Sequence, residues 1–165
     1  ILSALQQLRK IVFSRETILH GTKAYFDEIR PSMVDGEVAV CATIIPEIAL
    51  YSALITRTPG NKRGGGAWNF TRKGGKLTLV FRITQTRLEF LLSDPVLHGY
   101  VYPLDTYDFE KRSSCECRLY KPRTLRKRIL VTDDDLPFQP LPGKLEYKIE
   151  LPYTWKHHFV IQPIS

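Results

Sequence analysis

Two short stretches of the chain concentrate positive charge and contain no acidic residue. The first runs from Arg57 to Lys76, is rich in glycine, and carries Trp68 and Phe70 among its cations. The second runs from Arg118 to Arg128. Each holds six of the 24 lysine and arginine residues in a chain whose formal net charge is +7. Positive charge gathered in this way attracts anions, so we expect a surface that binds a polyanion.

The residues that we expect at this surface are the cations of both stretches and one tryptophan: Arg57, Lys62, Arg63, Trp68, Arg72, Lys73, Lys76, Arg118, Lys121, Arg123, Arg126, Lys127 and Arg128. Lysine and arginine contact phosphates, and an exposed aromatic ring beside them stacks on an unpaired base. The same residues suit an anionic membrane, where a polybasic segment gains about 1 kcal/mol per cation. In a third interpretation Trp68 and Phe70 pack back onto a sheet and fix the loop. Composition alone does not choose among the three.

No motif for nucleophilic, metal or phosphate-loop chemistry accompanies these cations. The four histidines are His20, His98, His157 and His158. None of them belongs to a recognisable catalytic or metal-binding motif. The glycines at 64–66 lack the Gly-Lys-Ser/Thr ending of a P-loop, and Asp133–Asp135 is more typical of a solvated turn than of a calcium loop. We therefore expect no enzymatic activity, no metal and no cofactor.

The cysteines and the hydropathy pattern bear on the compartment. Three cysteines (Cys41, Cys115 and Cys117) do not make a disulfide framework, and an odd count suits a reducing, intracellular compartment. Cys115 and Cys117 alternate on an expected strand, so we predict that they face the same side as buried thiols. The chain has no run of 18 apolar residues, and we therefore expect that it does not span a membrane.

The first third of the chain is expected to be mostly helical. Apolar residues at helical spacing predict an amphipathic helix over about residues 2–12. Ser14 is a plausible N-cap for a second helix through about Ile29, which Pro31 would end. A strand over Val38–Ile45 and a short helix beginning at Pro46 follow.

The rest of the chain predicts strands. Their expected ranges are Leu77–Phe90, Val96–Tyr102, Cys115–Tyr120, Arg128–Thr132, Lys144–Leu151 and Trp155–Ile161. We therefore predict a single α+β domain over residues 1–165. It has a helix-rich part with one strand over 1–56, a basic glycine-rich loop over 57–76, and an antiparallel sheet over 77–165. The N-terminal helices would pack on that sheet of about five or six strands.

The order of features from Leu77 to Leu151 resembles the core of rhabdovirus-type matrix proteins. The residues that carry this resemblance are the strand beginning Leu77-Thr-Leu-Val-Phe-Arg-Ile-Thr-Gln-Thr-Arg, the segment Cys115–Pro122, the proline-flanked Phe138 and the strand Lys144–Leu151. The family has a helix after the first of these strands, for which residues 93–102 offer no clear counterpart.

The resemblance implies a small, basic, non-enzymatic matrix protein. Such proteins condense the viral nucleoprotein, associate with themselves and attach to the inner face of an anionic membrane. The two basic stretches are then the implied contact positions, and the implied locations are the host cytoplasm, the inner membrane face and the virion. The alternative is a sequence-tolerant nucleic-acid-binding module that needs no assembly, such as a viral movement or silencing-suppressor protein.

Overall fold

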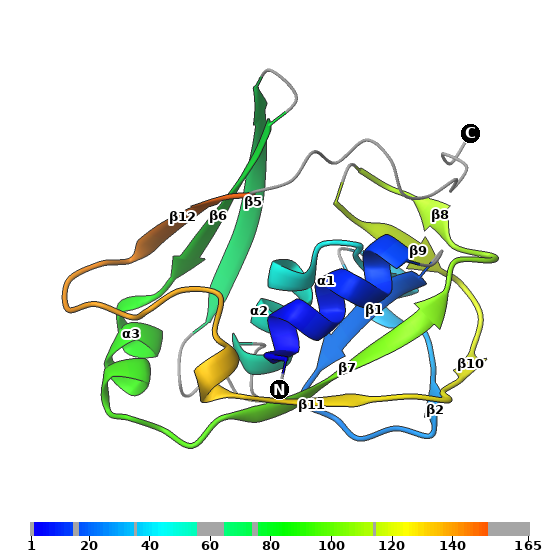
Figure 1. Cartoon of the computed structure of the whole chain (residues 1–165), viewed down its shortest axis with the longest axis horizontal. Coiled ribbons are helices and arrows are strands. Elements are labelled where there is room, and N and C mark those ends of the chain that lie inside the picture. The colour runs from blue at the N-terminus through cyan, green and yellow to red at the C-terminus, as the bar shows by residue number, and fades with distance from the viewer. Residues whose placement is uncertain are drawn as a thin grey trace.

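The computed structural model describes residues 2–14, 17–34, 36–55, 65–73, 76–113 and 115–151. Within these ranges the chain forms three α-helices, one 3₁₀ helix and twelve short strands in four antiparallel sheets (Figure 1). The predicted architecture, with N-terminal helices packed on one sheet of five or six strands, is therefore wrong. The chain is mostly β, and its helices are distributed along it rather than gathered at the start.

The helices are α1 (Ala4–Ser14), α2 (Pro46–Ile55) and α3 (Gln85–Leu92), with the 3₁₀ helix η1 at Asp133–Asp135. The strands are β1 (Thr17–Thr22), β2 (Glu28–Ile29), β3 (Ser32–Val34), β4 (Glu37–Ala42), β5 (Gly66–Lys73), β6 (Lys76–Ile83), β7 (His98–Asp105), β8 (Glu110–Lys111), β9 (Cys117–Leu119), β10 (Arg123–Thr124), β11 (Ile129–Thr132) and β12 (Glu146–Glu150). The strand orders of the sheets are β1-β7-β11, β10-β2, β12-β6-β5 and β3-β4-β9-β8.

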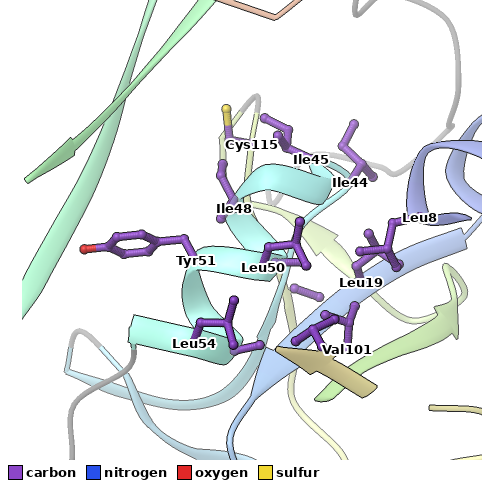
Figure 2. Close-up of a cluster of buried hydrophobic side chains, with 14 of the residues drawn as sticks. Leu8, Leu19, Ile44, Ile45, Ile48, Leu50, Tyr51, Leu54, Val101 and Cys115 are labelled. Atoms are coloured by element: carbon purple, nitrogen blue, oxygen red, sulfur yellow. The ribbon is translucent and has the colours of Figure 1, made fainter. Parts of the chain in front are cut away.

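Helix α2 lies at the centre of the hydrophobic core, and nearly all of its residues are buried (Figure 2). Two glycines let the β1-β7-β11 sheet approach its backbone. A Cβ atom on Gly21 of β1 would lie 2.0 Å from the carbonyl oxygen of Ala49, and one on Gly99 of β7 would lie 2.3 Å from that of Ala53. No side chain fits at such distances, so this sheet packs directly against the helix.

Another side of α2 faces the sheet formed by β12, β6 and β5. Tyr51 points away from the helix axis (Figure 2) and stacks on Phe81 of β6, with ring centroids 4.6 Å apart. Its hydroxyl donates to the carbonyl oxygen of Arg82 at 3.2 Å. Phe138, in the segment after η1, lies against Phe81 as well and stacks on Tyr147 of β12. The hydrophobic cluster around α2 extends from Ala4 to Leu151.

The predicted helix from Ser14 to Ile29 is wrong, because residues 17–22 form β1 and residues 28–29 form β2. Strand β1 is rich in β-branched residues, which favour extended backbone. It pairs with β7 along its whole length, from Thr17 opposite Asp105 to Thr22 opposite Tyr100. Gly21, which is unfavourable in a helix, is required here by the close approach to α2.

The expected strand Leu77–Phe90 ends at Ile83, and helix α3 follows it at residues 85–92. The Thr84 side chain caps this helix by accepting a hydrogen bond from the backbone N–H of Arg87. Part of the expected glycine-rich loop is also a strand: β5 forms a hairpin with β6, with Gly66 opposite Ile83 and Lys73 opposite Lys76. Residues 56–64 and 74–75 lie outside the described residues.

Other predicted elements are confirmed. Helix α1, strands β4 and β11, and a helix beginning at Pro46 lie where the sequence patterns predict them. On β6 the alternating row of Leu77, Leu79, Phe81 and Ile83 is buried. On β12 Tyr147 is buried and its charged neighbours are exposed, but Leu145, just before that strand, is exposed rather than buried. The strand expected over 155–161 lies outside the described residues.

Candidate polyanion-binding site

The second basic stretch forms one wall of a pocket of about 960 Å³. The other walls come from the end of β7 and the turn after it, with Ile11 of α1 and Thr17 of β1. Its charged lining residues are Lys121, Arg123, Arg126 and Lys127 on one side and Asp105 and Asp108 on the other. Four cations against two carboxylates leave the pocket with net positive charge.

The stretch is fixed at both ends and irregular in between. Strand β10 pairs with β2, with Arg123 opposite Ile29. The backbone N–H of Leu125 then donates to the carbonyl oxygen of Asp27 at 2.9 Å, and the Leu125 side chain is buried. Strand β11 begins only at Ile129. Residues 126–128 therefore cross the gap between two anchored strands.

Arg123 is buried and holds the turn that follows β7. Its Nη1 donates to the carbonyl oxygen of Asp105 and its Nη2 to that of Tyr107, both at 2.8 Å. The guanidinium also lies 3.7 Å from the centroid of the Tyr107 ring, which is cation–π geometry. In the same turn Asp108 has a φ of 66°, a left-handed conformation that aspartate tolerates better than most residues. Arg123 thus shapes the pocket wall.

The other cations of the pocket differ in how far carboxylates neutralise them. Lys121 Nζ lies 3.1 Å from Oδ2 of Asp108 in an exposed ion pair. Arg126 and Lys127 are exposed, and no carboxylate of the described residues forms an ion pair with either. These two side chains carry the uncompensated charge of the pocket.

Arg128, the last residue of the stretch, lies just beyond the pocket lining. Its Nη2 is 3.2 Å from Oδ1 of Asp27 and donates to the carbonyl oxygen of Phe26 at 3.2 Å. Its guanidinium lies 3.7 Å from the centroid of the Tyr25 ring. Arg128 is therefore already partnered by a carboxylate, a carbonyl and a ring.

Arg118 is buried, although strand alternation predicts that it faces water. Its Nη1 lies 3.5 Å from a carboxylate oxygen of Glu37 and its Nη2 lies 3.2 Å from one of Glu116. Glu37 also pairs with Arg112 and accepts from the Tyr120 hydroxyl at 3.2 Å. The hydrogen bond from Arg112 is the main cause that lowers the pKa of Glu37, and Tyr120 and Arg118 lower it further. Together they outweigh the desolvation of the carboxylate, which raises the pKa. Arg118 thus joins β4 to β9 and is not at a surface.

The first basic stretch is described only in part, because Arg57, Lys62 and Arg63 lie outside the described residues. On β5 the Trp68 and Phe70 side chains are partly buried and pack against the hydrophobic cluster, as the third interpretation expects. Arg72 and Lys73 are exposed. Lys76 Nζ lies 3.2 Å from Oε1 of Glu150 on β12.

The described parts of the two basic stretches do not form one surface. Figure 1 shows strands β5 and β6 on one side of the view and β10 on the other, with α1 and α2 between them. Of the predicted residues that the structure describes, it gathers Lys121, Arg123, Arg126 and Lys127 around one pocket.

Sequence reasoning overlooked Tyr107 and Tyr25 as site residues. In the sequence Tyr107 lies between Asp105 and Asp108, and this acidic surrounding gives no sign of an anion-binding role. Its partner Arg123 is 16 residues away, and Arg128 is more than 100 residues from Tyr25. Residues this far apart in the sequence produce no local pattern, so the pairs Arg123–Tyr107 and Arg128–Tyr25 can be recognised only from the folded structure.

The described residues offer little reactive chemistry elsewhere. They contain no group of three or more His, Cys, Asp and Glu side chains placed to hold a metal ion. The three cysteines are free thiols, and burial raises the pKa of Cys115 and Cys117 to about 12. Burial lowers the pKa of His20, which contacts the Cys41 carbonyl oxygen. Within the described part of the chain no helix is both long and apolar enough to cross a membrane.

No protein-family model, no curated protein and no solved structure matches the chain. The geometry of the pocket is therefore the main support for a functional proposal.

Proposed function

We propose that this protein is a non-enzymatic, matrix-like structural protein that holds a polyanion in the basic pocket and associates with itself. The observation that carries the proposal is the pair Arg126 and Lys127. Both are exposed at a pocket whose wall Arg123 fixes from within, and both lack a carboxylate partner among the described residues. Uncompensated cations on an anchored segment attract phosphate-bearing partners and release counterions when they bind them.

Further features support the matrix-like part of the proposal. The sequence resemblance covers Leu77 to Leu151, and α3 follows β6 directly, as the family's helix follows its first strand. Among the described residues β5 pairs only with β6, so one edge of the hairpin offers backbone groups to a second copy. Free thiols suit a reducing compartment. The proposed partners are nucleoprotein and, peripherally, the anionic inner face of a membrane.

A nucleic-acid-binding module that does not assemble is the second candidate. The observation that favours it is the shape of the site, since a pocket receives a chain or a headgroup better than it receives a flat bilayer. The two candidates share the pocket and differ in self-association and in membrane attachment.

The test compares two double variants that remove the same charge from different regions. Arg126→Ser with Lys127→Ser empties the pocket of its uncompensated cations, while Lys73→Ser with Lys148→Ser removes two exposed cations of the hairpin sheet. Binding to vesicles containing phosphatidylserine and to a labelled RNA is measured over a salt series. We expect salt-dependent binding of the unmodified chain, a loss of about tenfold or more in the pocket variant, and a change under about twofold in the control.

Self-association is measured separately by sedimentation velocity over a range of protein concentrations. Assembly that increases with protein concentration would support the matrix-like function. A monomer at every concentration would contradict that function and favour the nucleic-acid-binding module that does not assemble. Unchanged binding in the pocket variant, or a loss confined to the hairpin variant, would contradict the assignment of the pocket.

A further inference from the structure

Two arginine–tyrosine stacks frame the second basic stretch. Arg123 covers one face of the Tyr107 ring and Arg128 covers one face of the Tyr25 ring, each with its guanidinium 3.7 Å from the ring centroid. Even so, Tyr107 is 60% exposed and Tyr25 is 61% exposed. The Tyr25 ring also meets the Tyr100 ring edge to face, with centroids 5.4 Å apart. Even with these contacts, exposures of this size leave a large accessible area on each tyrosine for a further partner.

The two stacks are held by arginines that are close in the chain. Arg123 and Arg128 are five residues apart, so their Cα atoms are at most about 18 Å from each other. At about 3.4 Å per stacked nucleotide, that upper limit corresponds to at most about five nucleotides between the two Cα atoms. Arg126 and Lys127, the two cations without a carboxylate partner among the described residues, lie between them in the chain.

We propose that this pocket, together with the Tyr25 ring beyond its lining, binds single-stranded nucleic acid. Tyr107 stacks on one base and Tyr25 on another, while Arg126 and Lys127 contact the intervening phosphates. This inference rests on the proposed function, in which the pocket holds a polyanion. It adds the partner class and two residues that the charge pattern does not reveal.

The arginine under each ring strengthens this arrangement. A guanidinium against one face fixes the ring plane in advance, so a base meets a preordered platform and the entropic cost of binding falls. Base–aromatic stacking tolerates any sequence because every base has a π face. Both arginines are themselves held in place, Arg123 by two carbonyl oxygens and Arg128 by the Phe26 carbonyl oxygen and the Asp27 carboxylate.

A membrane and a duplex fit this site less well. Tyr107 and the two cations Arg126 and Lys127 line a pocket, which a single strand enters more readily than a flat bilayer does. In a duplex the bases are paired and stacked on each other, so neither tyrosine reaches a free base face. The site therefore discriminates in favour of unpaired strands.

The test measures fluorescence anisotropy with a labelled ten-nucleotide RNA, both single-stranded and as a blunt duplex. Tyr107→Leu removes the ring, and Tyr107→Phe is the matched control that keeps it. Tyr25→Leu and Tyr25→Phe form an independent second pair, and urea unfolding confirms that each variant is folded. We expect tighter binding of the single strand than of the duplex. Each leucine variant should lose about 5- to 100-fold in single-strand affinity, and each phenylalanine variant under about threefold.

The outcomes separate this inference from the proposed function. If both leucine variants bind the single strand as the unmodified chain does, while Arg126→Ser with Lys127→Ser loses affinity, stacking is overturned and the polyanion pocket remains. If the serine variant also binds normally, both proposals fail. Binding of phosphatidylserine vesicles without binding of the single strand would overturn the nucleic-acid assignment in favour of a lipid surface.

Discussion

The β5–β6 hairpin and the stretch from Arg118 to Arg128 are both basic and free of acidic residues in the sequence, but their cations have different surroundings in the fold. In the hairpin sheet strand pairing brings acids of β12 to bases of β6: Arg82 lies directly opposite Glu146 and Lys76 lies diagonal to Glu150, with ion pairs of 3.1 and 3.2 Å. In the second stretch irregular backbone separates the cations. Arg118 is drawn into the interior, while Arg126 and Lys127 remain without carboxylates among the described residues.

The difference shows that the number of cations in a segment is a poor guide to a binding site. Lys76 and Arg82 of the hairpin each meet a carboxylate of β12, whereas Arg126 and Lys127 meet none among the described residues. The neighbouring strand therefore decides whether a cation is neutralised, and the composition of the cation's own segment does not.

Replacing Arg118 should give the largest effect on stability. Arg118→Met leaves Glu37 and Glu116 without their shared partner, and we expect the free energy of unfolding to fall by about 3 kcal/mol. The matched change in the hairpin sheet, Arg82→Met, breaks an exposed pair and should cost less than about 1 kcal/mol. Urea denaturation followed by tryptophan fluorescence measures both. Equal losses of unfolding free energy in the two variants would contradict the conclusion that Arg118 is buried in a network while Arg82 forms only an exposed ion pair.

The salt dependence of oligonucleotide binding should separate the two regions next. For a single strand each neutralised phosphate contributes about 0.7 to the slope of log K against log salt concentration. Arg126→Ser with Lys127→Ser should therefore reduce the slope by about 1.4, while Lys73→Ser with Lys148→Ser should leave it unchanged. An unchanged slope in the pocket variant would mean that its cations contact no phosphate.

Several individual elements could be predicted from local patterns, but the architecture could not, and the wrong predictions have physical causes. The alternation of Leu77, Leu79, Phe81 and Ile83 and the proline at 46 gave correct elements because their signals are local. The segment 17–29 was misassigned as a helix because its apolar residues fit either period. What decides for a strand is the fit of Gly21 against Ala49, a contact between distant parts of the chain. Tertiary packing overrides local preference at such positions.

The candidate site was predictable only as a list of cations. The sequence places Arg118, Arg123, Arg126 and Lys127 in one stretch, and nothing local tells which of them are buried. Arg118 depends on Glu37, 81 residues earlier, and Arg123 on carbonyl groups 16 and 18 residues away. The stacking role proposed for Tyr107 depends on the same long-range contact.

Glu37 supplies a test of the buried network through pH. Its pKa is lowered from an ordinary value of 4.5, so the folded state releases this proton more readily than the unfolded state. The resulting stabilisation is present above about pH 4.5 and is lost as the pH falls through the lowered pKa. The unmodified chain should therefore have a clearly larger free energy of unfolding than Glu37→Gln at pH 7. This difference should shrink toward zero as the pH falls below about 4.5. Glu146→Gln, in the hairpin sheet, should show a smaller difference at pH 7, and a larger one would contradict the comparison.

The smallest effect is expected at Trp68. Trp68 packs against the core from β5, on a hairpin separate from the pocket, so it should not meet a bound strand. Trp68→Phe should change single-strand affinity by under about twofold. In the single-tryptophan variant Trp155→Phe, the emission of Trp68 should also stay constant while the ten-nucleotide RNA is added. Quenching of that emission, together with a loss of affinity in Trp68→Phe, would place the bound strand on the hairpin. The charge of Arg72 and Lys73 would then matter more than that of Arg126 and Lys127.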